Sequence, residues 1–274
     1  MQMIEKVSEA VKFLKEKGFE APEVGIILGT GLGALVDEIK VEKEFVYSNI
    51  PHFPIATVEF HKGKLLYGLL EGKKVVAMQG RFHYYEGHSM GQIVFPVRVM
   101  QALGIKKLIV SNAAGCMNLN WKKGELMLAD DHINLQPENP LRGYEAAAFG
   151  QIFTDMSQPY DPEMNQSLKK VALESGITLH EGVYVSVAGP NLETRAEYKY
   201  LRMIGADVVG MSTVPEVIAA NQMGLPVAAI SVLTDECDPE NLQPINIEEI
   251  IAIAKEAEKD LVVLIKGLMR MVAQ

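Results

Sequence analysis

The sequence predicts a single α/β domain that spans residues 1–274. Short apolar runs alternate with segments of helical periodicity along the chain, an alternation that is typical of α/β folds. We find no internal repeat, low-complexity segment, Gly/Ser linker or shift in composition that would divide the chain. With 274 residues and 48% hydrophobic content, the chain is large enough to bury one sizeable core.

The two ends of the chain carry the clearest helix patterns. The N-terminal pattern stops at Gly18, a residue type that commonly ends helices. The C-terminal pattern is longer, and Asn246 with Glu249 resembles a capping pair at its start. The apolar positions of the first helix are Ile4, Val7, Val11 and Leu14. Those of the last helix are Ile250, Ile253, Ala257, Leu261, Leu264, Leu268 and Met271.

Six apolar runs between these helices predict strands, and each run leads into small or polar residues. Ligands of open α/β sheets bind outside the carboxyl ends of the strands. Six such ends therefore predict one pocket that is assembled from the whole chain. The runs are 24–28, 74–78, 106–111, 183–187, 207–210 and 227–233.

The first predicted strand leads into a glycine-rich loop. Gly29, Gly31 and Ala34 fit the G-x-G-x-x-G/A fingerprint of a dinucleotide site. That interpretation needs an acidic residue about 20 positions further on, and the Pro-broken stretch 47–54 supplies none. The alternatives are a structural turn, or a cradle of backbone N–H groups for a smaller anion to which Thr30 adds a hydroxyl. We favour a cradle for free phosphate because other strand ends carry anion-binding side chains.

Two further strand ends predict an anion site. Arg81 and His83 lie two positions apart, so on an extended segment they point the same way. Arginine offers a rigid fork of donors, and histidine adds a donor whose charge changes near neutral pH. A lone arginine is usually a solvated surface residue, but this pair directly after a buried type of strand favours an anion site. Ser212 and Thr213 precede Pro215, so we expect one hydroxyl to cap a helix and the other to join the anion site.

The remaining strand ends are less specific. The small residues 113–115 either admit a ligand to backbone amides or only allow close packing of a strand on a helix. Glu193 comes just before a predicted helix, as a capping charge or as an acceptor that faces the pocket. Asp235 follows a fully apolar strand, where an acidic residue is more often functional than structural.

The composition excludes several classes of function. A net charge of −9 argues against a nucleic-acid surface, which needs a basic face. The two cysteines, Cys116 and Cys237, form no zinc or disulfide motif. The first residues mix charges with apolar residues, unlike a signal peptide, and no apolar run approaches the ~18 residues of a membrane helix. We expect a cytoplasmic protein that binds neither nucleic acid nor a membrane.

Taken together, the motifs resemble the trimeric purine nucleoside phosphorylases, in the family that also holds methylthioadenosine phosphorylases. The match covers nearly the whole chain, and "QGRFH" (79–83) and "GMSTVPE" (210–216) are its most specific segments. The resemblance implies a single α/β domain around a mixed, partly barrel-like sheet flanked by helices. It also implies a homotrimer with active sites near the subunit contacts. The implied reaction is phosphorolysis of a purine (deoxy)ribonucleoside to the free base and (deoxy)ribose 1-phosphate, with inorganic phosphate as co-substrate and no metal or organic cofactor.

The resemblance also implies the site residues, position by position. The expected phosphate ligands are Thr30, His61, Arg81, His83, the backbone of Ala113, and Ser212. The expected ribose neighbours are Tyr85, Met211, Ile247, and Phe153 from a neighbouring subunit. The expected purine neighbours are Leu192, Glu193 and Asp235. The expected catalytic residues are His83, Glu193 and Asp235.

Two positions depart from the inosine- and guanosine-cleaving type, which normally has Asn at 235 and His at 247. A protonated Asp235 offers one donor and one acceptor, which suits adenine, and Ile247 offers apolar surface that suits a 5′-methylthio group. Glu193 is retained and suits the protonated ring nitrogen of hypoxanthine or guanine. We therefore expect cleavage of inosine and guanosine, with adenosine as an additional substrate, and an S-methyl-5′-thioadenosine phosphorylase as the alternative. A nicotinamide-dependent oxidoreductase and a non-catalytic nucleoside-binding protein are the rival classes.

Overall fold

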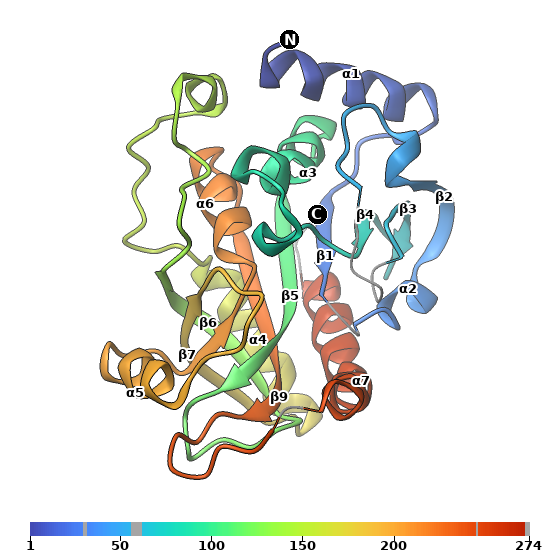
Figure 1. Cartoon of the computed structure of the whole chain (residues 1–274). Coiled ribbons are helices and arrows are strands. Elements are labelled where there is room, and N and C mark those ends of the chain that lie inside the picture. Colours follow the sequence, from blue (N-terminus) through green and yellow to red (C-terminus); the bar gives the residue numbers. More distant parts are fainter. Residues whose placement is uncertain (30–31, 56–61, 245, 272–274) are drawn as a thin grey trace.

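The computed structural model describes residues 1–29, 32–55, 62–244 and 246–271 (Figure 1). Within these residues the chain forms a mixed nine-stranded sheet. Its strands are β1 (Val24–Leu28), β2 (Lys40–Val46), β3 (Lys64–Leu70), β4 (Lys73–Gln79), β5 (Lys107–Cys116), β6 (Leu126–Asn134), β7 (Leu179–Ser186), β8 (Val208–Gly210) and β9 (Val227–Glu236). All six strands predicted from the apolar runs are present, although β5 continues through the small residues that we expected to follow it.

The sheet closes on itself over part of its width. The strand order is β2-β3-β4-β1-β5-β8-β7-β6-β9, and β5 also pairs with β9. Strands β5, β8, β7, β6 and β9 therefore form a closed ring, while β1 to β4 extend from β5 as an open sheet. This is the mixed, partly barrel-like sheet that the resemblance implies.

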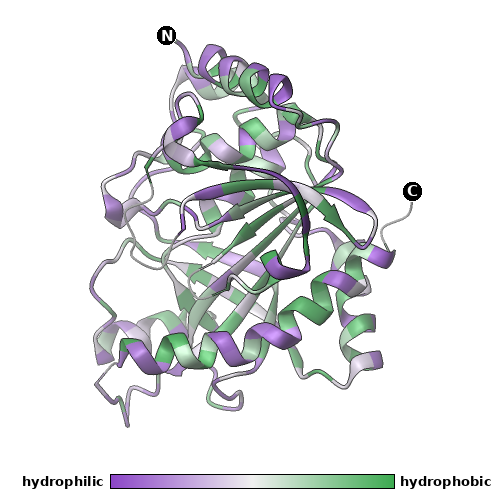
Figure 2. Cartoon of the chain, turned by 90° about the vertical axis from the view of Figure 1, so that its right-hand side faces the viewer, coloured by the Kyte–Doolittle hydropathy of each residue, from purple (hydrophilic) through white to green (hydrophobic). Residues whose placement is uncertain are grey.

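Helices cover both faces of the sheet (Figure 1). The α-helices are α1 (Met3–Glu16), α2 (Leu35–Glu38), α3 (Met90–Leu103), α4 (Pro162–Ser175), α5 (Arg195–Met203), α6 (Val214–Gln222) and α7 (Ile247–Met271). Three 3₁₀ turns accompany them: η1 (Tyr47–Asn49), η2 (Tyr84–Glu86) and η3 (Tyr144–Phe149). One buried cluster joins the sheet to α1, α3 and α6, a second joins it to α4 and α7, and a small third cluster lies under α5. Figure 2 shows the strands as mainly apolar, whereas apolar and polar residues alternate along the helices.

Both terminal helices follow their predicted boundaries. Helix α1 ends just before Gly18, whose φ of +94° suits glycine and terminates the helix. At the start of α7, the Asn246 carboxamide oxygen accepts from the backbone N–H groups of Glu248 and Glu249. Among the described residues, the Glu249 carboxylate accepts from Lys123 at 2.6 Å and does not complete a capping box with Asn246. Over the described part of the chain, no helix combines the length and the apolarity needed to cross a bilayer.

Strand direction gives the pocket a different origin from the one the sequence suggested. Strands β1, β4, β5 and β9 run parallel, so their carboxyl ends meet at one edge. Strand β8 runs antiparallel to the last residues of β5, and β7 runs parallel to β8. The rule that ligands bind at the carboxyl ends of parallel strands therefore does not explain why the segments after β7 and β8 reach the cavity. They reach the same edge because the short β8 pairs with β5 at Gly115 and Cys116.

Candidate active site

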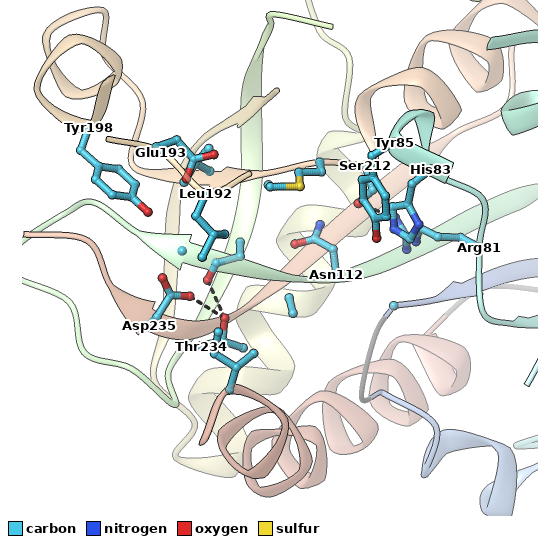
Figure 3. Close-up of a pocket in the computed structure, with 18 residues that line it drawn as sticks. Arg81, His83, Tyr85, Asn112, Leu192, Glu193, Tyr198, Ser212, Thr234 and Asp235 are labelled. Atoms are coloured by element: carbon cyan, nitrogen blue, oxygen red, sulfur yellow. Dashed lines mark hydrogen bonds between the residues drawn. The ribbon is translucent and has the colours of Figure 1, made fainter. Parts of the chain in front are cut away.

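A cavity of about 170 Å³ lies where β5, β8 and β9 meet the loop that follows β4 (Figure 3). Its walls come from segments that are far apart in the sequence, as the six predicted strand ends suggested. Nine of the sequence-predicted residues line it: Arg81, His83, Tyr85, Ala113, Leu192, Glu193, Met211, Ser212 and Asp235.

The polar residues of the cavity form two separate groups (Figure 3). Arg81, His83 and Ser212 lie at one end, which we call the cationic end. Glu193 and Asp235 lie at the other, which we call the acidic end. Asn112 lies between the two groups.

Arg81 is almost completely buried and is held by several acceptors. One terminal nitrogen donates to the hydroxyl oxygens of Ser212 and Thr213, both at 3.0 Å. The other donates to the backbone carbonyls of Ile27 and Ser111. The buried Glu216 carboxylate lies 3.6 Å from the first nitrogen. These contacts fix the guanidinium group in advance, so an anion at this end meets a positive charge that costs little conformational entropy to use.

The turn before α6 points its hydroxyls toward Arg81. Thr213 has φ +70° and ψ −56°, a region that a β-branched residue rarely adopts, and Val214 N–H donates to the Ser212 carbonyl across it. Such strain costs on the order of 1–3 kcal/mol and collects at ligand sites. Pro215 stands in the first turn as predicted, but the prediction that one hydroxyl caps α6 is wrong. The Thr213 hydroxyl instead accepts from Arg81 and from the Asn112 amide.

His83 is oriented by the short turn η2. Glu86 accepts from the backbone N–H of His83 and pairs with its Nδ1, both at 2.8 Å. Because a carboxylate only accepts, Nδ1 carries the hydrogen and the neutral ring keeps its lone pair on Nε2. Burial lowers the pKa of His83 and the Arg81 charge lowers it further, against the effect of Glu86. The imidazole stacks on Tyr85 with 4.6 Å between ring centroids, and burial raises the pKa of Tyr85 to about 12.

A β-bulge aims Asp235 into the acidic end. Along the parallel pair, Ala114 matches Leu233 but Gly115 matches Asp235, so Thr234 is the extra residue of β9. A bulge turns the following side chain, and bulges are common next to active sites. The Thr234 hydroxyl lies 2.9 Å from Oδ1 of Asp235 and 3.3 Å from the carbonyl of Ala114 (Figure 3).

Glu193 faces the cavity rather than capping a helix. The N-cap residue of α5 is Thr194. Its hydroxyl accepts from the backbone N–H of Glu197, and the Glu197 carboxylate accepts from the backbone N–H of Thr194. Glu193 is left to accept a hydrogen bond from Tyr198. Burial raises the pKa of the Glu193 carboxyl, and the nearby charge of Asp235 raises it further.

Two predicted residues of the described chain, Phe153 and Ile247, do not line the cavity. Two others, Thr30 and His61, lie outside the described residues. Phe153 is 95% exposed and borders a different hollow, beside His132 and Arg142. Ile247 is 53% exposed at the start of α7, and Ile250, one turn later, lines the cavity in its place.

Sequence reasoning missed Asn112, Thr234, Tyr198, Ile250 and Glu216. Asn112 and Thr234 are adjacent in the sequence to Ala113 and Asp235, which we did predict, so this adjacency could have indicated them. Tyr198 and Ile250 read as ordinary apolar positions of helices, and only the fold turns them toward the cavity. Glu216 gave no signal, because a glutamate in a first helical turn is normally a solvated charge.

The model of the phosphorylase superfamily matches residues 23–270 of the chain. Purine nucleoside phosphorylase 1 of Bacillus subtilis (strain 168) is 45% identical over 266 residues, which cover 97% of this chain and 98% of the relative. Purine nucleoside phosphorylase 1 of Geobacillus stearothermophilus is 47% identical over 268 residues, 98% of each chain. A crystal structure of Schistosoma mansoni purine nucleoside phosphorylase in complex with adenosine superposes with a TM-score of 0.94 at 39% identity, over 100% of both chains. The chain therefore belongs to the phosphorylase superfamily, among its purine nucleoside phosphorylases.

Proposed function

We propose that this purine nucleoside phosphorylase acts mainly on inosine and guanosine and their deoxy forms, with adenosine as an additional substrate. The products are the free base and (deoxy)ribose 1-phosphate. One observation carries the proposal: a single cavity has Arg81, His83 and Ser212 at one end and Glu193 with Asp235 at the other. A phosphate and a purine, joined through a sugar, need these two kinds of group at opposite ends of one site.

The cationic end suits a phosphate dianion. Arg81 supplies positive charge in a buried place, where an ionic hydrogen bond is stronger than in water. Nε2 of a neutral His83 accepts from a protonated phosphate oxygen, or donates once the ring is protonated. The chain carries a net charge of −9, so this local charge, and not the overall field, must attract the anion.

The middle of the cavity supports the sugar while the glycosidic bond breaks. The bond between C1′ and the purine nitrogen breaks with its electron pair on the base, and the sugar becomes oxocarbenium-like. A phosphate oxygen stabilises that cation and then forms the new bond to C1′, so positioning supplies much of the rate. Tyr85 and Met211 also line the cavity, and we propose that they pack against the ribose.

The acidic end suits the leaving base. The purine departs with extra electron density, which hydrogen bonds to its ring must absorb. An ionised Glu193 accepts from N1–H of hypoxanthine and from the 2-amino group of guanine, which favours 6-oxopurines. Asp235 accepts from the 6-amino group of adenine, which is why adenosine is included.

We propose further that inorganic phosphate is the only co-substrate and that no metal or organic cofactor takes part. The phosphate itself stabilises the developing cation, and no electrons are transferred to an acceptor. Phe153, with 95% of its surface exposed, is the side chain that we propose to complete the ribose site of a neighbouring subunit in a homotrimer. We propose a cytoplasmic location, because both cysteines are free thiols, as is usual in a reducing compartment.

Release of free base from a panel of nucleosides, with and without phosphate, tests the proposal. We expect release only with phosphate, with inosine and guanosine ahead of adenosine. Release without phosphate would indicate a hydrolase, stabilisation without release would indicate a binding protein, and an absorbance change that needs NAD would indicate an oxidoreductase.

An S-methyl-5′-thioadenosine phosphorylase is the second candidate, and one observation favours it. Ile250 presents an apolar surface to the cavity from α7, which suits a methylthio group better than a hydroxyl. A kcat/KM for methylthioadenosine well above that for inosine would decide for this candidate. A matched variant, Asp235→Asn, is expected to shift preference toward inosine, and an unchanged preference would remove Asp235 from the base site.

A further inference from the structure

Behind the acidic end, two protein groups hold the carboxyl group of Asp235 by hydrogen bonds. Tyr198 packs beside one of them, Cys237, in the small third cluster. The Cys237 thiol donates to Oδ2 of Asp235, with 3.1 Å between sulfur and oxygen. The other oxygen, Oδ1, accepts from Thr234 at 2.9 Å. Both oxygens of Asp235 therefore have a protein donor.

The side chains around these hydrogen bonds are tightly packed. Cys237 and Tyr198 are 1% and 2% exposed and share the small third cluster beneath α5. The backbone N–H of Cys237 donates to the carbonyl of Cys116 at 2.7 Å, which ties the end of β9 to β5. Gly115 leaves the space that the thiol fills, because a Cβ at this position would lie 2.7 Å from Sγ.

Cys237 does not line the cavity itself, so any effect that it has on the substrate must pass through Asp235 or Tyr198. A donor on Oδ2 makes that oxygen an acceptor and restrains rotation of the carboxyl group. Asp235 then presents acceptor lone pairs to the base. A 6-amino group donates to such lone pairs, whereas a 6-oxo group facing them is repelled.

We propose that Cys237 is a positioning residue for base specificity, which holds Asp235 as a hydrogen-bond acceptor. This inference rests on the proposed function and deepens it, because it identifies what admits adenosine beside inosine. Without the thiol, Asp235 is free to rotate, and its preference for a 6-amino group declines.

The test compares kcat/KM for adenosine and inosine, and the phosphate KM, in the wild type and in three variants. Cys237→Ala removes the donor and is expected to lower the adenosine-to-inosine ratio about three- to tenfold, the range for one ordinary hydrogen bond, because a thiol is a weak donor. Cys237→Ser keeps a donor and is expected to retain most of the ratio. Cys116→Ala is the matched control, because this second buried thiol donates to the Asn118 carbonyl at 3.4 Å and is expected to leave the ratio unchanged. The phosphate KM is expected to stay constant throughout.

A double-mutant cycle with Asp235→Asn tests whether the thiol acts through Asp235. If it does, the effects of Cys237→Ala and Asp235→Asn on the ratio are less than additive. Fully additive effects would overturn the proposal.

Other outcomes distinguish failure of the Cys237 proposal from failure of the proposed function. An unchanged ratio in Cys237→Ala, or an equal loss in Cys237→Ser, would mean that the thiol only fills space and would overturn the proposal. A wild type that cleaves inosine but not adenosine would overturn it as well, since Asp235 would then not recognise a 6-amino group. A wild type that releases no base from either nucleoside in the presence of phosphate would instead refute the proposed function.

Discussion

At the scale of single residues, two buried arginines allow a matched comparison. Arg81→Lys keeps a positive charge but loses the fork that Ser212, Thr213 and the backbone carbonyls hold. Loss of a charge-assisted hydrogen bond is worth about 1.5–3 kcal/mol, so we expect the phosphate KM to rise roughly 10- to 100-fold. Initial rates over a range of phosphate concentrations, at saturating inosine, measure the change.

Arg98→Lys is the control for that comparison. Arg98 is equally buried, on α3, but it stacks on Phe149 with 4.1 Å to the ring centroid and donates to the Pro140 carbonyl. Its replacement is expected to lower the melting temperature and leave the phosphate KM unchanged. If Arg81→Lys instead raises only the KM for the nucleoside, the phosphate assignment of Arg81 is wrong.

The carboxyl of Glu193 gives a prediction about pH. Burial and then the charge of Asp235 raise its pKa, and the ionised form accepts more strongly from N1–H of hypoxanthine than the protonated form does. As the pH falls through this raised pKa, kcat/KM for inosine should therefore fall. In Asp235→Asn one negative charge is removed, so the acidic limb of the profile should move to lower pH. The limb should move only part of the way to the ordinary pKa of a glutamate, because burial, the larger cause of the raised pKa, remains in the variant. A limb that stays in place or moves upward would show that Glu193 is not the group that titrates.

Single residues also show how far the sequence could lead. Arg81 and His83 were predictable because two anion-binding side chains, spaced by two, directly follow a buried strand. The role of Thr213 was not, since the sequence favours a capping hydroxyl and only the backbone strain turns that hydroxyl toward Arg81. Phe153 and Ile247 were assigned by resemblance, and the described chain places neither against the cavity.

At the scale of elements, the bulge in β9 depends on a glycine in the neighbouring strand. A Cβ on Gly115 would lie 2.7 Å from Sγ of Cys237 and 3.1 Å from Oδ2 of Asp235. Gly115→Ala therefore has to displace one or both side chains from the acidic end. We expect the KM for inosine to rise about tenfold or more with an unchanged phosphate KM, since Asp235 lies at the acidic end that we propose binds the base, away from Arg81 and Ser212. Steady-state kinetics in each substrate measure the two constants.

Gly91→Ala provides the comparison at the same scale. Gly91 lies in the first turn of α3, and its added Cβ would meet only the flexible end of Met3, at 3.1 Å. Alanine favours a helix over glycine by up to about 1 kcal/mol, so this variant should be as stable as the wild type and equally active. Equal kinetic constants in Gly115→Ala and the wild type would mean that the acidic end tolerates the added methyl group.

The elements also separate what periodicity can predict from what it cannot. The apolar runs of β1, β4 and β9 were visible because these strands are buried on both faces. Strand β2 is exposed along most of its length and carries alternating charges, so no apolar run marked it. Periodicity does not show the direction of a strand. The way in which β7 and β8 bring their following segments to the site was therefore not predictable from the sequence.

At the scale of the whole molecule, closure of the sheet brings the two ends of the site together. The ring of β5, β8, β7, β6 and β9 lets β5 pair with β8 and β9 at once. The cationic end is then built beside the β8–α6 turn and the acidic end on β9, within one cavity. A closed ring is a long-range property, so the sequence suggested it only through the resemblance.

Phe153 gives the prediction that belongs to the assembly. Its side chain is 95% exposed and lies away from the cavity of its own chain, so in a single subunit its loss should leave the fold intact. If the protein is a homotrimer in which this ring completes a neighbour's ribose site, Phe153→Ala should raise the KM for inosine roughly tenfold while the mass in solution stays three times that of the chain. Light scattering after size exclusion and steady-state kinetics measure the two quantities.

Mixed trimers show in which subunit the ring acts. A Phe153→Ala subunit has an intact cavity and lacks the ring that it would lend, whereas a Glu193→Ala subunit lacks the acidic acceptor and retains Phe153. When the two are refolded together, some Phe153→Ala cavities receive the ring of a Glu193→Ala neighbour. Activity at low inosine should therefore exceed the sum of the two parent enzymes. Activity equal to that sum, with exchange of subunits demonstrated by a mass tag, would show that Phe153 does not act across the subunit contact.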